Sequence, residues 1–359
     1  MSFYKFFRPF IFKLDAEDAH NLAINFLKYF PNLASICVIN RQYKNLSQKL
    51  WGLDFVSPIG MAAGFDKNAE VIKALQKFGF GFVEVGTVTP RAQSGNDKPR
   101  LFRLEEDEAI INRLGFNNKG CEVFARNISS VKSSIKNEII GINIGKNKDS
   151  EDAATDYLFL LEKFYEAASY ITINISSPNT KNLRDLQKQD QLDALLSAIS
   201  NKKFQLQNKH KKNIPLWLKV APDLEIEEQK AIAELALKHK IDALIISNTT
   251  ISRQFNLKSK HANENGGLSG KPLFSKSNEV LKNFYKFSEG KIILIGVGGI
   301  FNAKDAYEKI KCGASMVQIY SSLIYQGFGA IEKITQELSE LVAKDGFENI
   351  SQAVGIYSK

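Results

Sequence analysis

Polar residues that could bind or transform a ligand follow short apolar runs at many points of this sequence. They are Asp66 and Lys67, Thr87, Asn143, Asn174 with Ser176 and Ser177, Lys219, Ser247 to Thr249, Gly298 and Gly299, and Tyr320 and Ser321. Each has an ordinary explanation as a turn residue. If the apolar runs are parallel strands, however, their ends converge on one mouth, and these residues form a single site.

Two of these strand ends indicate a phosphate site. Residues 295–300 (IGVGGI) and 318–322 (QIYSS) offer small side chains and free backbone N–H groups. Such groups bind anions well, and the last two loops of a (β/α)₈ barrel are a frequent phosphate position.

Two lysines raise the question of negative charge in a ligand. Lys219 lies inside the apolar run 216–221, where an unpaired ammonium costs several kcal/mol to bury. Either an acidic side chain pairs with it, or it stabilises negative charge on a bound cofactor. Lys67, next to Asp66, is a candidate for binding a substrate anion.

The segment 171–187 (ITINISSPNTKNLRDLQ) ends a strand and continues as a polar stretch that could close over a ligand. Asn174 and Asn179 bracket two serines there, and amide side chains suit a ring with amide-like edges. On its own, Ser177 would be an ordinary turn serine.

The elements that must position these residues alternate regularly from about residue 51. The eight apolar runs are 59–64, 82–88, 139–145, 170–175, 216–221, 243–248, 292–298 and 316–321. The helix-like segments between them include 67–78, 151–169, 190–210, 225–240, 276–289 and 303–311. This pattern predicts an α/β fold, a (β/α)₈ TIM barrel. A doubly wound sheet is disfavoured because an early GxGxxG turn is missing.

Three segments are additional to the strands and helices of a minimal barrel. Residues 50–58 are expected to form a hairpin that plugs the barrel bottom, and residues 99–116 an inserted antiparallel strand pair above the strands. Residues 248–270 are expected to form a long polar loop, which in a compact domain usually covers or binds a ligand.

The N-terminal segment differs from the rest. Residues 1–13 hold six aromatic and three basic side chains without an acid, and residues 15–30 predict an amphipathic helix with Asp15 as its N-cap. The segment is either a helical pair packed on the main domain or an interfacial membrane anchor. We divide the chain into residues 1–45, a helical membrane-associating segment, and residues 46–359, the barrel.

Composition sets limits on the class of protein. The 359 residues carry 48 basic and 39 acidic side chains, a net charge of +9, and 44% are hydrophobic, which excludes a disordered chain. Three cysteines exclude a disulfide scaffold, and four scattered histidines predict no metal site. No apolar run is long enough to span a bilayer, and the N-terminus lacks the apolar core of a signal peptide.

A series of motifs in order along the chain resembles the dihydroorotate dehydrogenase family. The motifs are AAGFDKN (62–68), EVGTVTP (84–90), GNDKPRLFRL (95–104), INRLGFNN (111–118), GINIGKNK (141–148), NISSPNT (174–180), LKVAPD (218–223), ISNTT (246–250), GGLSG (266–270), IGVGGI (295–300), VQIYS (317–321) and DGFENISQAVG (345–355). The N-terminal extension and Ser177 are similar to those of the membrane-associated, quinone-reducing class 2 enzymes.

The resemblance implies an FMN enzyme that oxidises dihydroorotate to orotate in pyrimidine biosynthesis. The residues implied in FMN binding are Ala63, Gly64, Thr87, Asn143, Asn174, Lys219 and Ser247, with Gly270, Gly299, Tyr320 and Ser321 at the phosphate end. Those implied in substrate binding are Lys67, Asn112, Arg113, Leu114, Gly115, Phe116, Asn174, Asn179, Asn248 and Thr249. Ser177 is implied as the catalytic base.

The chemistry is consistent with these roles. A proton must leave C5 of the substrate and a hydride must leave C6, so a base must face the flavin across the substrate. Serine is a weak base at neutral pH, and we expect desolvation and a water near Thr180 to assist Ser177. Class 1 relatives use cysteine there, but Cys37, Cys121 and Cys312 all lie elsewhere.

Two alternative activities stay open at this point. One is a class 1-type enzyme that uses fumarate or NAD, and the other is an RNA-modifying flavin barrel similar to dihydrouridine synthase. The resemblance favours a membrane quinone as partner, no nucleic acid, a monomer, and a peripheral position on the cytoplasmic side of the cell membrane. It implies that residues 1–45 also provide access for the quinone and that the barrel, residues 46–359, binds FMN.

Overall fold

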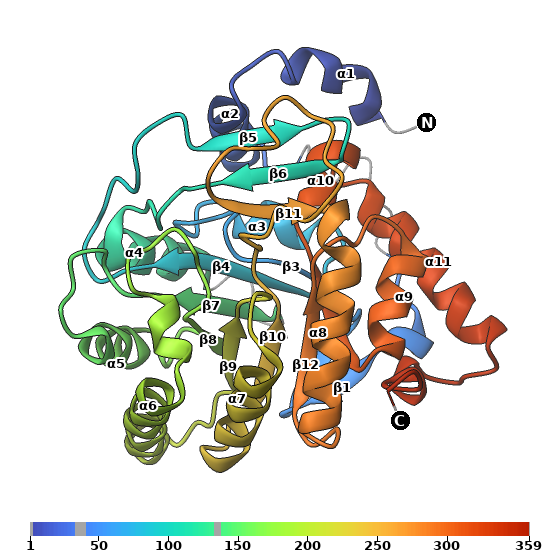
Figure 1. The fold of residues 1–359 in the computed structure, drawn as a ribbon. Coiled ribbons are helices and arrows are strands. Elements are labelled where there is room, and N and C mark those ends of the chain that lie inside the picture. The colour runs from blue at the N-terminus through green and yellow to red at the C-terminus, as the bar shows by residue number, and fades with distance from the viewer. Residues whose placement is uncertain (1–2, 33–40, 133–137, 359) are drawn as a thin grey trace.

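The computed structural model describes residues 3–32, 41–132 and 138–358 of the chain. Eight parallel strands form a closed barrel, and helices surround it (Figure 1). The predicted TIM barrel is therefore confirmed. In their order around the barrel, the strands are β3 (Ile59–Met61), β4 (Phe82–Val88), β7 (Ile140–Ile144), β8 (Tyr170–Asn174), β9 (Leu216–Val220), β10 (Ala243–Ile246), β12 (Ile293–Val297) and β13 (Ala314–Ile319).

The strands are buried on both faces because helices cover the barrel outside and side chains fill it inside. The barrel helices are α3 (Ile72–Gln76), α4 (Gly120–Lys132), α5 (Ala153–Phe164), α6 (Gln189–His210), α7 (Ile226–Lys238), α8 (Phe274–Phe287), α9 (Ala303–Lys311), α10 (Ser321–Gln326) and α11 (Ala330–Lys344). Of these, α4, α10 and α11 had no counterpart among the predicted helices.

The helix predicted for residues 67–78 is much shorter in the structure. The Asp66 carboxylate accepts hydrogen bonds from the backbone N–H groups of Glu70 and Val71, both at 2.8 Å. Ala69 has a positive φ of 59°, which a helix excludes. These two features keep residues 67–71 in a loop, so α3 begins only at Ile72.

A hairpin closes the bottom of the barrel, as predicted. Strands β1 (Gln48–Leu50) and β2 (Leu53–Phe55) are joined by Trp51 and Gly52, whose φ angles of 53° and 78° fit a tight two-residue turn. Phe55 packs edge-on against Phe82, and Trp51 lies 5.6 Å from Trp217 between ring centroids. These rings fill the lower end of the barrel.

Above the barrel mouth lies a small antiparallel sheet. Its strands β5 (Leu101–Leu104) and β6 (Ala109–Asn112) are the predicted pair. The third strand, β11 (Gly267–Gly270), pairs with β6 and lies within the segment that was expected to be only a loop. Sequence alone did not show this strand because the residues with which it pairs are 155 to 161 positions away.

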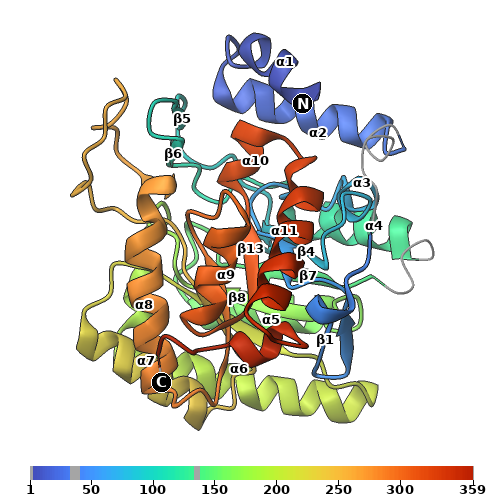
Figure 2. The same ribbon diagram turned by 90° about the vertical axis from the view of Figure 1, so that its right-hand side faces the viewer.

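The two N-terminal helices lie over this sheet, at the top of both views (Figures 1 and 2). They are α1 (Phe3–Ile11) and α2 (Ala16–Tyr29), and Asp15 caps α2 by accepting hydrogen bonds from Glu17 N and Asp18 N. Glu17 forms a buried two-point ion pair with Arg100, at 2.7 and 3.0 Å. The segment is thus packed on the barrel; residues 1–2 and 33–40 of it lie outside the described residues.

Candidate active site

A cavity opens at the carboxyl ends of the barrel strands, beneath the small sheet. It holds about 1220 Å³ of empty space, part of it open to solvent. Every barrel strand except β7 contributes lining residues from its carboxyl end or the loop that follows it, and the small sheet contributes the rest. The position is the one that parallel barrels generally use for ligands.

Nearly all residues singled out in the sequence meet in this cavity. Its wall includes Ala63, Gly64, Lys67, Thr87, Asn112, Leu114, Gly115, Phe116, Asn174, Ser177, Asn179, Lys219, Ser247, Asn248, Thr249, Gly270, Gly299, Tyr320 and Ser321. The structure therefore brings together residues that are up to 258 positions apart, from Ala63 to Ser321.

Two predicted site residues, Asn143 and Arg113, do not line the cavity. Asn143 is fully buried, and its side chain is occupied by Glu84 at 2.8 Å and Thr87 at 2.5 Å. Arg113 turns outward, where it pairs with Glu264 at 2.8 Å and lies over the Phe102 ring.

Glu84 forms the polar centre of the barrel and was missed in the sequence. Its carboxylate accepts hydrogen bonds from Asn143 Nδ2, Tyr170 OH, Thr172 Oγ1 and Gln318 Nε2, at 2.8 to 3.2 Å. Asn143 then accepts a hydrogen bond from Asn174 Nδ2 at 3.1 Å, which fixes Asn174 at the cavity wall. The acid within the apolar run FVEVGTV was the available signal.

Neither the Lys67 nor the Lys219 ammonium group makes a hydrogen bond, or an ion pair within 4.0 Å, to any described residue. Burial lowers the pKa of Lys219, although the negative charge of Glu84 opposes this shift. Burial also lowers the pKa of Lys67, to about 8, with Glu17 and Asp66 opposing and Arg100 adding to the effect. A close structural ion pair, the ordinary explanation for Lys219, is thus not found, and both ammonium groups suit negative charge on a ligand.

The loop after β8 places Ser177 at the cavity. Ser177 is 6% exposed, and its Oγ accepts a hydrogen bond from Asn179 N at 3.3 Å. Nearby in sequence, Thr180 Oγ1 is buried without a hydrogen-bond partner among the described residues. A buried hydroxyl without a protein partner can form its hydrogen bonds to a bridging water instead.

Three amide side chains, those of Asn112, Asn179 and Asn248, also line the cavity. Asn179 Nδ2 donates to the backbone and side-chain oxygens of Asn112, at 3.1 and 3.2 Å. Asn248 Nδ2 donates to Ser176 Oγ at 2.8 Å. These contacts hold the three amides at the cavity. Each amide could instead form hydrogen bonds to the polar ring of a ligand.

Other polar atoms of the cavity residues also lack partners. Asn117 Oδ1, Gln318 Oε1 and Ser322 Oγ are buried with no hydrogen bond to the described residues. Unpaired buried polar atoms are costly, so this wall suits a ligand with several hydrogen-bonding groups. These three residues were not assigned to the site from the sequence, although they lie within the motifs 111–118 and 318–322.

The glycine loop after β12 forms the remaining wall. Gly298 and Gly299 have φ angles of 106° and 76°. A Cβ on Gly299 would lie 2.5 Å from Phe274 Cβ and 2.7 Å from its Cα. The loop can therefore approach α8 closely only because position 299 has no side chain, and its backbone stays open to a ligand.

Fold and cavity define a barrel protein built to bind a polar, anionic ligand at its strand ends. A sequence model of the family described as dihydroorotate dehydrogenase matches residues 45–342, and the chain belongs to this family. Two relatives named dihydroorotate dehydrogenase (quinone) are similar over nearly their whole length. The one from Burkholderia multivorans is 49% identical over 91% of this chain and 94% of its own. The one from Rhodopseudomonas palustris is 47% identical over 97% of this chain and 94% of its own.

Solved structures agree with this assignment. The dihydroorotate dehydrogenase of Eimeria tenella in complex with ferulenol superimposes with a TM-score of 0.89, at 38% identity and 96% coverage of both chains. Its ligand-free form also gives 0.89, at 39% identity, over 94% of this chain and 99% of that one. The predicted family is thus confirmed. Because the relatives are named dihydroorotate dehydrogenase (quinone), this activity is favoured over both alternative activities.

We predict that Gly299→Ala destabilises the protein more than Gly346→Ala does. Both glycines have similar positive φ angles, 76° and 81°, but a Cβ at Gly346 meets nothing within 4 Å. The free-energy cost of placing alanine at a positive φ is therefore similar at both positions. The contact with Phe274 adds about 1–3 kcal/mol of destabilisation only at position 299. Urea unfolding of the two variants measures the difference; equal midpoints would contradict the contact.

Proposed function

We propose that this protein oxidises dihydroorotate to orotate with bound FMN, and that a membrane quinone is its final electron acceptor. The observation that carries the proposal is its similarity, over almost the entire chain, to enzymes named dihydroorotate dehydrogenase (quinone). The cavity adds support, because it combines a serine, two unpaired lysines and several amides at one mouth.

The cavity fits a flavin mononucleotide. Asn117, Gln318 and Ser322 offer unpaired polar atoms, and the glycine loop offers open backbone. The residues that would hold the ring and its ribityl chain are Ala63, Gly64, Thr87, Asn174, Lys219 and Ser247, with Asn143 fixing Asn174 and Thr87 from below. Gly270, Gly299, Tyr320 and Ser321 would hold the phosphate. When bound, FMN supplies the acceptor for the hydride that leaves C6 of the substrate.

Lys67 and the amides would hold dihydroorotate. The substrate is a carboxylate on a ring with amide edges, so it needs one cation and several groups that donate and accept. Lys67 supplies the cation, and Asn112, Asn179 and Asn248 supply the amides. Leu114, Gly115, Phe116 and Thr249 complete the wall around them. Arg113 is better explained as a support of the long loop, through Glu264.

Ser177 would take the proton from C5. Its burial excludes bulk water, and the unpaired Thr180 hydroxyl lies close in sequence to help hold a relaying water. Lys219 would stabilise negative charge that develops on the flavin side of the cavity. These two groups lie at the ends of different strands, β8 and β9, whose register places Asn174 beside Lys219.

The N-terminal helices would bind the membrane surface. Large apolar side chains are exposed along them, namely Phe6, Phe7, Phe10, Leu14, Leu22, Phe26, Tyr29 and Phe30. Aromatic side chains next to Arg8 and Lys13 suit the interface of an anionic leaflet. None of the helices within the described residues is long and apolar enough to cross a membrane. We therefore propose peripheral binding, by a monomer, on the cytoplasmic side.

The function is tested by the spectrum and the half-reactions of the purified protein. We expect a flavin absorbance that dihydroorotate bleaches without oxygen, and that a soluble quinone restores faster than fumarate or NAD. Absence of bleaching would refute the activity. Faster recovery with fumarate or NAD would refute only the acceptor.

We expect Ser177→Ala to slow flavin reduction by dihydroorotate at least about 100-fold, because a general base contributes at least that much. The variant should keep its flavin and its affinity for orotate, since removing one hydroxyl leaves the other cavity contacts in place. Stopped-flow absorbance measures the rate, and orotate titration provides the control. Normal reduction in this variant would exclude Ser177 as the base.

The affinity for orotate should fall as pH rises through about 8. Lys67 has a pKa near 8, and only its protonated form attracts the carboxylate, so the dissociation constant should increase about tenfold between pH 7 and 9. Calorimetric titration with orotate measures this without turnover. Lys67→Arg keeps its charge at these pH values and should remove the dependence. Constant affinity of the unmodified protein from pH 7 to 9 would contradict the assignment.

The membrane proposal predicts that Phe6→Asp together with Phe10→Asp weakens binding to vesicles of anionic lipid at least tenfold. Both rings are more than 60% exposed on α1, so the folded barrel should be unaffected. Phe204→Asp on α6 is the matched control, since Phe204 is 67% exposed and α6 lies at the opposite end of the molecule from the N-terminal helices (Figure 2). Vesicle flotation measures binding; equal loss in both variants would contradict a surface formed by α1.

A further inference from the structure

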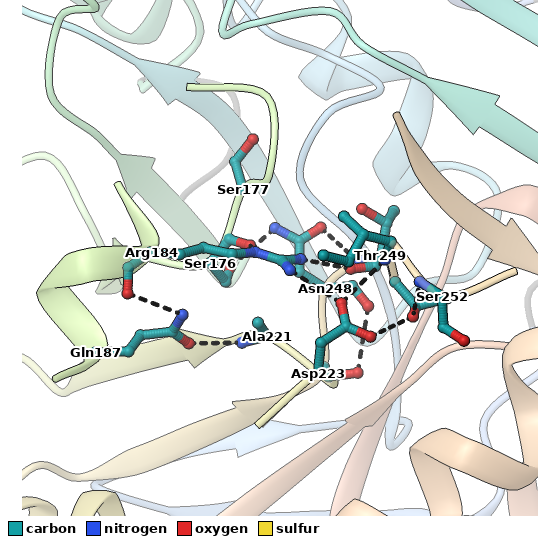
Figure 3. Close-up of polar contacts among 12 residues, drawn as sticks. Ser176, Ser177, Arg184, Gln187, Ala221, Asp223, Asn248, Thr249 and Ser252 are labelled. Atoms are coloured by element: carbon teal, nitrogen blue, oxygen red, sulfur yellow. Dashed lines mark hydrogen bonds and ion pairs between the residues drawn. The ribbon is translucent and has the colours of Figure 1, made fainter. Parts of the chain in front are cut away.

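One arginine joins three loops at the cavity mouth. Arg184 begins the short 3₁₀ helix Arg184–Gln187, later in the loop that carries Ser177. Its Nε donates to Ser176 O at 3.0 Å, and one terminal nitrogen donates to Thr249 O at 2.9 Å (Figure 3). The other terminal nitrogen pairs with Asp223 Oδ2 at 2.9 Å. All three guanidinium nitrogens are therefore engaged, each with a different loop segment.

Asp223 anchors this arginine at the end of β9. Its carboxylate also accepts hydrogen bonds from Ile251 N at 3.0 Å, Lys276 Nζ at 2.9 Å and Thr250 Oγ1. Burial alone would raise the pKa of Asp223, but these donors lower it below its usual value. The anchor therefore stays ionised at neutral pH, and its position is fixed from the loop after β10 and from α8.

The two carbonyls that Arg184 binds belong to residues next to proposed reacting and recognition groups. Ser176 precedes Ser177, and Thr249 itself lines the cavity beside Asn248. The Asn248 side chain reaches back to Ser176 Oγ at 2.8 Å. Figure 3 shows the Ser177 side chain pointing away from this network, so its hydroxyl takes no part in the contacts of Arg184 that hold the preceding carbonyl.

A second contact ties the same loop to β9. Gln187 Oε1 accepts a hydrogen bond from Ala221 N at 2.8 Å, and Gln187 is 5% exposed. The loop is thus fixed at both Arg184 and Gln187, on the side away from the cavity. Arg184 is not one of the residues that line the cavity, so it would act on a ligand through Ser176 and Thr249.

We propose that Arg184, anchored by Asp223, is a positioning residue for proton transfer: it sets the distance between the Ser177 loop and the loop of Asn248 and Thr249. This inference rests on the proposed function. A planar guanidinium can satisfy two carbonyls and a carboxylate together, whereas an ammonium cannot reproduce that geometry. Because a displacement of about 1 Å can reduce a rate about 100-fold, loss of this bridge should slow abstraction of the C5 proton.

The test compares Arg184→Lys with Lys276→Met in the complete flavoprotein. Lys276 binds the same Asp223 carboxylate, so its replacement removes a positive charge there without touching Ser176 or Thr249. We expect Arg184→Lys to slow flavin reduction between about 10- and 100-fold, and Lys276→Met to change it less than about threefold. Flavin content and the unfolding temperature show whether each variant is folded.

Isotopic substitution separates positioning from general destabilisation. If proton abstraction becomes slower, deuterium at C5 of dihydroorotate should slow reduction more in Arg184→Lys than in the unmodified protein. The effect of deuterium at C6 should not increase. An unchanged C5 effect, or equal rates in the two variants, would overturn the proposal. If Arg184→Lys does not fold, Asp223→Asn is measured instead, with the same isotopic criteria.

Different results would refute the proposed function and the proposed role of Arg184. If the unmodified protein is not reduced by dihydroorotate, the proposed function is wrong. If it is reduced normally and only the variant comparison fails, the function stands and Arg184 is merely a structural residue.

Discussion

The interior of the barrel depends on one buried carboxylate. Glu84 accepts hydrogen bonds from side chains of β7, β8 and β13, so strands that are distant in sequence share one acceptor. In a low-dielectric interior, loss of that acceptor would leave four donors unsatisfied. Its negative charge also opposes the effect of burial on Lys219. The same group therefore supports the strands and keeps a cation available at the cavity.

The cavity is organised in layers that extend outward from this centre. Asn143 bonds to Glu84 and in turn fixes Thr87 and Asn174, which form the floor. Above the floor, the loops carry the groups that would meet a substrate. Those loops are held from outside, by Arg184 on one side and by the small sheet on another. Thr87, Asn174 and the loop of Ser177 are thus each held by a residue that does not line the cavity.

Much of this arrangement was predictable from the sequence because parallel strands leave a simple signature. Apolar runs marked the eight strands, and the polar residues at their ends marked the cavity. Side-chain direction was not predictable in the same way. Asn143 and Arg113 stand in the right motifs, yet one points into the barrel and the other toward Glu264. Strand β11 depends on pairing with β6, and the shortening of α3 depends on the Asp66 side chain. The first of these features arises from a tertiary contact, and the second from a local side-chain contact that the apolar pattern of the helix does not record.

The hairpin at the bottom has a kinetic consequence for the whole molecule. Trp51, Phe55 and the rings around them fill that end, and the cavity lies at the other end, beneath the small sheet. Within the described residues, ligands therefore reach the cavity from the side of the loops, the small sheet and the N-terminal helices rather than through the bottom of the barrel. Motions of those covering elements, and not of the packed hairpin, would then limit how fast a ligand enters or leaves.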